Sequence, residues 1–148
     1  SALWTLRGKR LAVLGLAFKG GTDDIRESPA LAIVQSLLQQ GSKVTAYDPA
    51  AIDRTREILG DQIAYATSSY EAAHHADALL ILTEWEEFAN LDLGRIRQEL
   101  RYPIVIDGRN LYEPEMMAAQ GFTYYSVGRE AAHPDGVPAG VLKNGKKA

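Results

Sequence analysis

The sequence of 148 residues contains no cysteine. Disulfide bonds, thiolate metal sites and cysteine nucleophiles are therefore excluded within this chain, although the absence does not by itself identify a cellular compartment. The sequence also has no apolar run long enough to cross a membrane, and its first residues lack the basic and apolar regions of a signal peptide. We therefore expect a cytoplasmic protein with no membrane partner.

An excess of positive charge is missing as well. The chain carries 16 lysines and arginines against 19 aspartates and glutamates, and its formal net charge is −3. A general surface for polyanions is thereby excluded, and no segment resembles an RNA-binding or DNA-binding module, so we expect no nucleic-acid partner. Positive charge can act only in a local pocket. With 46% hydrophobic residues, a chain of this length suits one domain with a substantial core.

Short strand and helix signals alternate along the sequence. Apolar runs of strand length predict strands at residues 10–16, 43–47, 63–66, 78–82, 104–106 and 123–126. Helical spacing and end signals predict helices from about residue 28 to 41 and at 51–59, 68–75, 93–100 and 114–120. This alternation predicts an α/β fold with a doubly wound, mainly parallel sheet of about six strands and helices on both faces, as in Rossmann-like domains.

Several of the predicted helices begin with capping signals. Ser28 precedes Pro29, which is the usual order of an N-cap residue and a proline at the first helical position. The capping-box spacing, in which a serine or threonine is followed three residues later by glutamate, occurs at 68–71 and again at 83–86. Each of these signals predicts a helix start.

The segment Gly15–Ala30, GLAFKGGTDDIRESPA, carries the strongest functional signal. It leaves an apolar strand, turns at Gly20 and Gly21, which tolerate positive φ, and enters a capped helix. Its two long cations, Lys19 and Arg26, lie at the carboxyl end of the first strand, where open α/β sheets bind ligands. Ammonium and guanidinium groups favour phosphate or carboxylate. We therefore expect an anion-binding site in this loop.

A complete dinucleotide site is not predicted for this loop. The dinucleotide fingerprint requires three glycines in a G-x-G-x-x-G turn, whereas the loop here is longer and lacks that array. Asp23, Asp24 and Glu27 would compete with a phosphate, and the two aspartates are better suited to stabilising the N-terminus of the helix. Asp48, in the sequence AYDP, resembles the ribose-binding acid but lies too far along the chain, so we predict that it forms a turn and a helix entry.

The histidine pair at 74–75 and Trp85 could suggest a metal site or a ligand contact, but we predict structural roles for them. His74 and His75 are adjacent, so they cannot face one ligand from a helix, and no neighbouring cluster supplies metal-ligand spacing, so we predict no metal site. Trp85 lies near the start of a helix after the fourth strand. We favour a packing role for it, and the alternative is that it lines a cleft.

Four motifs in a fixed order give the sequence a family resemblance. They are GLAFKGGTDDIRESPA, YDP at Tyr47–Pro49, LTEW at Leu82–Trp85 and DGRN at Asp107–Asn110. From about Arg10 to Tyr125, the sequence resembles the C-terminal UDP-binding domain of the UDP-glucose/GDP-mannose dehydrogenase family. The resemblance implies a family that oxidises the C6 alcohol of a nucleotide sugar to an acid with two NAD, and TEW and DGRN are similar to its UDP-glucose 6-dehydrogenase branch.

The resemblance implies roles for four residues and a catalytic role for none. Phe18 and Lys19 match a Phe-Lys pair that contacts the UDP-sugar, and Arg109 matches an arginine that contacts the sugar. Arg26 matches an arginine that reaches toward the NAD bound by the other domain of the enzyme. The residues alone leave alternatives open, because Arg26 could pair with a neighbouring carboxylate and Arg109 could be an ordinary loop cation.

The resemblance also implies a domain organisation. Residues 1–9 would be the remnant of an upstream linking helix, residues 10–132 the UDP-sugar-binding C-terminal domain, and residues 133–148 a flexible tail. The NAD fingerprint, catalytic cysteine and dimerising helix of the family lie upstream of the matched region. We therefore expect this chain to be inactive alone and to belong to a full-length enzyme that forms a homo-oligomer.

Three other interpretations stay open. The chain could be a stand-alone, non-catalytic module that binds or senses UDP-sugars. It could be the same domain of a UDP-N-acetylmannosamine or GDP-mannose dehydrogenase. It could also be a structural docking domain whose basic loop binds the acidic surface of a partner.

Overall fold

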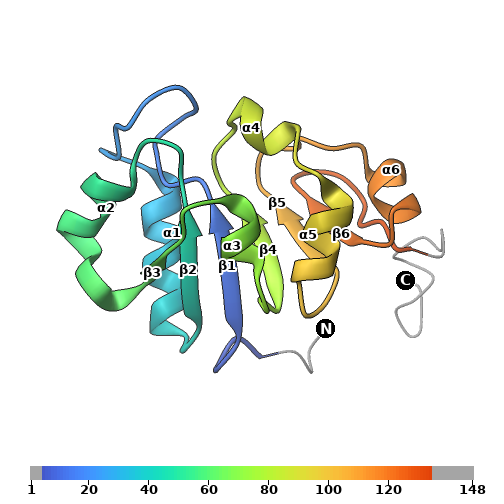
Figure 1. Ribbon diagram of the computed structural model, residues 1–148, viewed down its shortest axis with the longest axis horizontal. Coiled ribbons are helices and arrows are strands. Elements are labelled where there is room, and N and C mark those ends of the chain that lie inside the picture. The colour runs from blue at the N-terminus through green and yellow to red at the C-terminus, as the bar shows by residue number, and fades with distance from the viewer. Residues whose placement is uncertain (1–4, 135–148) are drawn as a thin grey trace.

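The computed structural model describes residues 5–134, which form a single six-stranded sheet with surrounding helices (Figure 1). Every strand pair is parallel, and the strand order is β3-β2-β1-β4-β5-β6. The strands are β1 (Arg10–Leu14), β2 (Lys43–Tyr47), β3 (Ala64–Tyr65), β4 (Ala78–Ile81), β5 (Ile104–Asp107) and β6 (Thr123–Ser126). The order reverses between β1 and β4, so the predicted doubly wound, Rossmann-like sheet is confirmed.

The connections between the strands are helical, and they divide between the two faces of the sheet. The helices are α1 (Pro29–Gln39), α2 (Ile52–Leu59), α3 (Ser69–Ala73), α4 (Glu86–Ala89), α5 (Leu93–Glu99) and α6 (Pro114–Ala119). Apolar residues of α1 and α2 belong to one buried cluster, and those of α3, α4, α5 and α6 belong to the other. Figure 1 shows α3 and α5 on the near face of the sheet.

Alternating side chains of the central strands build the two hydrophobic layers. On the α1 side, Val13 of β1 packs in one cluster with Val34 of α1. On the other side, Leu14 of β1 and Ile81 of β4 pack in one cluster with Ile96 of α5. Because β1 and β4 are covered on both faces, β1 from Leu11 onward and all of β4 are continuously apolar rather than alternating.

One part of the sheet keeps an exposed apolar face. Ile106 of β5, Tyr125 of β6 and the following Val127 are 38%, 42% and 62% exposed. Ile106 and Tyr125 alternate with Val105 and Tyr124, which are fully buried under the helices of the opposite face. The described helices therefore leave this side of β5 and β6 open.

The predicted capping boxes have different outcomes. The Ser68 hydroxyl accepts the Glu71 backbone N–H at 3.0 Å, as predicted, at the start of α3. The box predicted at Thr83 and Glu86 is wrong, because α4 begins at Glu86 without a capping side chain. Thr83 is fully buried, and its hydroxyl donates to the Ala17 carbonyl at 2.9 Å, so a contact across the sheet edge replaces the local cap.

The two ends of the described chain bear on the predicted domain boundaries. Residues 5–9 form a turn before β1, in which Leu6 packs against the α1 side of the core. Residues 1–4 lie outside the described residues, so the linking-helix remnant predicted at 1–9 stays a prediction. Ala132 pairs with Tyr124 in an antiparallel bridge, and residues 135–148 of the predicted tail lie outside the described residues.

Candidate functional site

Loops from three strands meet at the carboxyl edge of the sheet. They follow β1 at residues 15–28, β4 at residues 82–85 and β5 at residues 108–113. Since all strands are parallel, these loops lie at one edge, where doubly wound sheets bind ligands. The first loop carries Lys19 and Arg26 and the third carries Arg109, so the predicted site residues share this edge.

Asp48, directly after β2, ties the first loop to the second. It is only 2% exposed, and its Oδ2 accepts the backbone N–H groups of Leu16 at 2.8 Å and Ala17 at 3.1 Å. Its Oδ1 accepts two further backbone N–H groups just before α2, both at 2.8 Å, which confirms the predicted turn and helix entry. The indole N–H of Trp85 also donates to Oδ2, at 3.3 Å.

These contacts decide against a ribose-binding role for Asp48. A ribose acid must offer its carboxylate to the hydroxyls of a bound dinucleotide. The Asp48 carboxylate is buried and already accepts five N–H donors from the protein. Together with the missing three-glycine turn, this arrangement does not fit a complete NAD site within the described residues.

The loop after β1 approaches the loop after β4 at two glycines. A Cβ atom on Gly15, whose φ is +102°, would lie 2.5 Å from Thr83 Cβ. A Cβ atom on Gly20 would overlap the carbonyl oxygen of Glu84. Glycine at both positions therefore lets the backbone next to Lys19 lie directly against residues 83 and 84.

Two hydrogen bonds close the loop after β1 on itself. The Phe18 N–H donates to the Asp24 carbonyl at 2.6 Å, and the Ser28 hydroxyl donates to the Leu16 carbonyl at 2.8 Å. Ser28 occupies the N-cap position of α1, as predicted, but its side chain makes no capping hydrogen bond. Its hydroxyl instead fixes the end of the loop to Leu16 at the beginning of the loop.

Arg109 is held at the same edge by two acids. Its backbone N–H donates to Oδ1 of Asp107 at 2.8 Å, while Oδ2 of Asp107 accepts the Leu111 N–H at 2.7 Å. Its guanidinium forms an ion pair with Glu84 of the neighbouring loop. The Arg109 side chain keeps 34% of its surface exposed, so it remains accessible. The structure thus brings Arg109 to the segment that Gly20 contacts.

Below Arg109, a buried network fixes the end of β5. Tyr124 is fully buried, and its hydroxyl donates to Oδ2 of Asp107 at 2.6 Å. Nη2 of Arg129 donates to the same hydroxyl at 3.1 Å. Burial, followed by the hydrogen bond to Asp107, raises the pKa of the Tyr124 phenol well above its ordinary value. The phenol therefore stays protonated and serves as a donor that orients the carboxylate.

Phe18 and Lys19 are both exposed on the first loop. Phe18 keeps 47% of its surface accessible. Lys19 forms no ion pair with any residue that the structure describes. The cation at the tip of the loop therefore remains available for an external anion.

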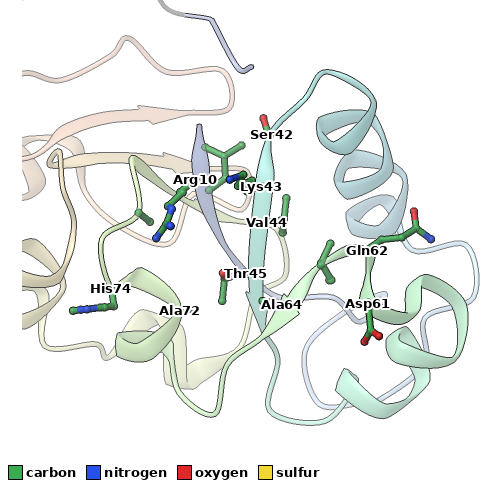
Figure 2. Close-up of a pocket in the computed structure, with 13 residues that line it drawn as sticks. Arg10, Ser42, Lys43, Val44, Thr45, Asp61, Gln62, Ala64, Ala72 and His74 are labelled. Atoms are coloured by element: carbon green, nitrogen blue, oxygen red, sulfur yellow. The ribbon is translucent and has the colours of Figure 1, made fainter. Parts of the chain in front are cut away.

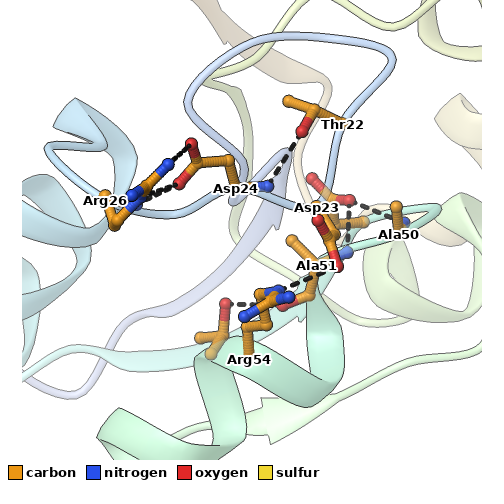
Figure 3. Close-up of polar contacts among 9 residues, drawn as sticks. Thr22, Asp23, Asp24, Arg26, Ala50, Ala51 and Arg54 are labelled. Carbon is orange, nitrogen blue, oxygen red and sulfur yellow. Dashed lines mark hydrogen bonds and ion pairs between the residues drawn. The ribbon is translucent and has the colours of Figure 1, made fainter.

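Arg26 is paired with a carboxylate of its own loop (Figure 3). Its Nε and Nη2 donate to the two carboxylate oxygens of Asp24 at 3.1 and 2.9 Å, and the Arg26 side chain is 87% exposed. Nearby, Nε of Arg54 on α2 donates to Asp23 at 2.8 Å. The expectation that the two aspartates stabilise the N-terminus of α1 is wrong, because both bind arginines instead. These residues line an open cavity of about 480 Å³.

The Asp24 carboxyl should titrate far below the ordinary aspartate range. The side-chain hydrogen bonds of Arg26, followed by its backbone N–H, lower the Asp24 pKa from 3.8 to about 2. A depressed folded-state pKa means that the interaction is fully present above pH 3.8 and is lost as the pH falls through about 2.

A carboxyl ¹³C NMR titration of the wild type and of Arg26→Gln measures this effect. We expect the variant to raise the Asp24 pKa only part of the way, because the backbone N–H of residue 26 still donates. An unchanged pKa in the variant would show that the guanidinium does not hold Asp24 in solution.

Three acids at this edge were not identified as site residues from the sequence. Asp48 directly follows β2, Asp107 ends β5, and both organise the following turn, while Glu84 pairs with Arg109. The available signal was the position of Asp48 and Asp107 directly after predicted strands in the YDP and DGRN motifs. Nothing local marks Glu84, since its partner lies 25 positions later in the chain.

Another cavity lies at the opposite edge of the sheet. It has a volume of about 440 Å³ and is bordered by Arg10, Lys43 and Thr45 of the first two strands, with Ala64 and His74 on its other sides (Figure 2). Arg10 and Lys43 are the first residues of β1 and β2, Thr45 is in the middle of β2, and the others lie on neighbouring segments. The cavity is therefore separate from the loops that carry the predicted ligand contacts.

His74 and His75 contact each other and a neighbouring glutamate rather than a metal-ligand cluster. The rings of His74 and His75 stack with their centroids 3.8 Å apart, and Nδ1 of His74 lies 2.8 Å from Glu99. Within residues 5–134 there is no group of three or more side chains that could hold a metal ion. No helix in that part of the chain is long and apolar enough to span a membrane.

Comparison with known proteins places the sequence in a family. Residues 12–114 match the model of the UDP-glucose/GDP-mannose dehydrogenase family, UDP binding domain. The chain is 45% identical over 131 residues to UDP-glucose 6-dehydrogenase TuaD of Bacillus subtilis, with 88% of this chain and 28% of that protein covered. The chain thus spans little more than a quarter of that relative.

Solved structures agree with this assignment. A UDP-glucose dehydrogenase from Pyrobaculum islandicum matches with a TM-score of 0.69 and 33% identity, covering 82% of this chain and 26% of that one. A UDP-D-ManNAc dehydrogenase from Pyrococcus horikoshii has the same TM-score and identity, covering 86% of this chain and 27% of that one. Structural similarity alone therefore does not separate these two sugars.

Proposed function

Since this chain belongs to the UDP-glucose/GDP-mannose dehydrogenase family and corresponds to its UDP binding domain, we propose that it binds a UDP-sugar at the carboxyl edge of its sheet. The observation that carries the proposal is the meeting of the loops that bear Lys19 and Arg109 on one segment, residues 83–85. Phe18 and Lys19 contact the UDP-sugar from the first loop. Arg109 contacts the sugar from the third.

The chemistry of these side chains supports the assignment. Lys19 is an exposed ammonium without an ion-pair partner in the described chain, and such a point charge suits an anionic diphosphate. Arg109 presents a guanidinium fork whose free N–H groups can donate to sugar hydroxyls. Exposed Phe18 adds an apolar surface beside the ligand.

The activity that we propose belongs to a longer protein. We infer a cytoplasmic, homo-oligomeric UDP-glucose 6-dehydrogenase that oxidises UDP-glucose to UDP-glucuronate with two NAD. NAD is held mainly by parts of that protein outside this chain, and Arg26, exposed on the first loop, reaches toward it. This chain alone is inactive, because it contains no cysteine for the covalent step that the family uses.

Two features support an origin in a longer protein. The chain spans only 28% of the Bacillus subtilis relative. The exposed apolar side of β5 and β6, with Ile106, Tyr125 and Val127, suits contact with another part of such a protein, since parallel sheets are normally covered on both faces. A stand-alone module that only senses UDP-sugars has no comparable support.

Thermal unfolding with ligand tests the proposal. We expect UDP and UDP-glucose, but not NAD, to raise the unfolding temperature of this chain. Ligand at about a hundred times its dissociation constant stabilises the fold by about 2.7 kcal/mol, which corresponds to about 5 to 11 °C for a domain of this size. UDP-N-acetylmannosamine and GDP-mannose in parallel measure the preference among sugars and bases.

Two variants make the test specific. Lys19→Ala should abolish most of the shift caused by UDP-glucose, because it removes the cation proposed to meet the diphosphate. Lys43→Ala removes the same charge at the opposite edge of the sheet and should retain the shift. If no ligand produces a shift, this chain does not bind nucleotide alone and the proposed site requires the rest of the enzyme.

A further inference from the structure

The two cations of the site, Arg109 and Lys19, differ in whether a carboxylate of the protein neutralises them. The Arg109 guanidinium is paired with Glu84, whereas Lys19 has no ion-pair partner among residues 5–134. Both lie next to the same stretch of backbone, because Gly20 contacts the carbonyl of Glu84. One cation therefore presents a net positive charge, and the other is locally neutralised.

We propose that Glu84 is a specificity-determining residue of this site, which directs Arg109 toward uncharged hydroxyl groups and leaves the anionic part of the ligand to Lys19. The inference rests on the proposed function and adds a role for an acid that contacts no phosphate. Its effect on ligand binding passes through Arg109.

The geometry of the pair supports this division. Glu84 engages Nη2 of Arg109, and a guanidinium has five N–H donors, so others remain for a ligand hydroxyl. A phosphate approaching the same guanidinium would meet the Glu84 carboxylate, and a like charge beside a binding group discriminates against a charged ligand. The pair therefore accepts hydroxyls and disfavours phosphate.

The backbones of Arg109 and Glu84 are both fixed, and their side chains are accessible to a ligand. The Arg109 backbone is fixed by Asp107, and the Glu84 backbone is fixed between Gly20 and Trp85, whose indole binds Asp48. The two side chains are 34% and 45% exposed, so a ligand can reach them. An exposed ion pair adds little to folding, and its loss should leave the fold intact.

Ligand titrations of Glu84→Gln test the role of the carboxylate. Inorganic pyrophosphate, UDP and UDP-glucose are titrated into wild type, Glu84→Gln and Glu86→Gln, with binding followed by calorimetry and by NMR signals of arginine side chains. Glu86→Gln is a matched control, because it removes the same charge from the exposed first turn of α4. Glu84→Asp keeps the charge and should retain the wild-type ranking of ligands.

We expect Glu84→Gln to bind pyrophosphate about tenfold more tightly than the wild type, which corresponds to about 1.4 kcal/mol. The preference for UDP-glucose over UDP should fall by a similar factor, while Glu86→Gln leaves both quantities near wild type. Circular dichroism and the urea midpoint should stay unchanged in both variants, which separates the effect from a loss of structure.

The titrations distinguish a failure of the role proposed for Glu84 from a failure of nucleotide-sugar binding. If Glu84→Gln binds pyrophosphate no better than Glu86→Gln, or if neither binds it, the inference is overturned. If the wild type binds no UDP-sugar but Glu84→Gln gains pyrophosphate binding, the role of Glu84 stands and nucleotide-sugar binding by this chain fails. Equal gains in both glutamine variants would show a general charge effect and would also contradict the proposal.

Discussion

Replacing Asp48 with alanine should lower the free energy of unfolding by about 3 kcal/mol or more, because several buried N–H donors then lose their acceptor. The carboxylate accepts the backbone N–H groups of Leu16 and Ala17, two more before α2, and the indole of Trp85. Asp48 is only 2% exposed, so water can replace these bonds poorly. Urea unfolding followed by circular dichroism measures the loss.

Two further variants separate this effect from ordinary loss of charge. Asp48→Asn keeps the shape but turns one acceptor into a donor that faces N–H groups, so it should destabilise almost as strongly. Asp53→Ala removes an aspartate whose side chain is 95% exposed at the start of α2, and it should change stability by at most about 1 kcal/mol. Equal effects of Asp48→Ala and Asp53→Ala would contradict a central role for Asp48.

The fold was largely predictable because each strand is marked by its own sequence. The predicted strands at 43–47 and 123–126 coincide with β2 and β6, since charged or turn-forming residues bound short runs of strand-forming side chains. Alternation with helices then implied a parallel sheet. The remaining differences are a short 3-10 helix at Gly60–Gln62, which was not predicted, and the ends of elements. The helix predicted at 68–75 stops at Ala73, and His75 has a φ of +60°, which a helix does not allow.

The candidate site was predictable only where its residues lie in local motifs. The loop itself placed Lys19 and Arg26 at an anion site, whereas the particular ligands of Lys19, Arg26 and Arg109 came from a resemblance, and their ligand contacts stay predictions. The structure adds how they are held, through contacts between segments far apart in the chain. Thr83 illustrates the limit, because its spacing to Glu86 suggested a cap whereas its hydroxyl donates to Ala17 across the sheet edge. Local spacing cannot reveal a partner that lies 66 positions away.

Gly20→Ala should damage both the fold and the ligand site. An alanine Cβ would overlap the Glu84 carbonyl oxygen, so the loop that carries Lys19 must move away from residues 83–85. We expect a loss of about 2 kcal/mol in the free energy of unfolding. Because the loops that carry Lys19 and Arg109 would then no longer meet at residues 83–85, we also expect UDP-glucose to bind about tenfold more weakly, a loss of about 1.4 kcal/mol.

Gly21→Ala is the matched control, because it makes the same substitution one residue further along the loop. The φ of Gly21 is +82°, and a Cβ atom at this position would meet no other segment within 4 Å. The only expected penalty is therefore the strain of a left-handed backbone, about 1 kcal/mol. Urea unfolding and thermal shifts with UDP-glucose compare the two variants. If Gly21→Ala weakens ligand binding as much as Gly20→Ala, general loop conformation governs the site. If only Gly20→Ala does so, the contact with Glu84 is what sets the two cations in place.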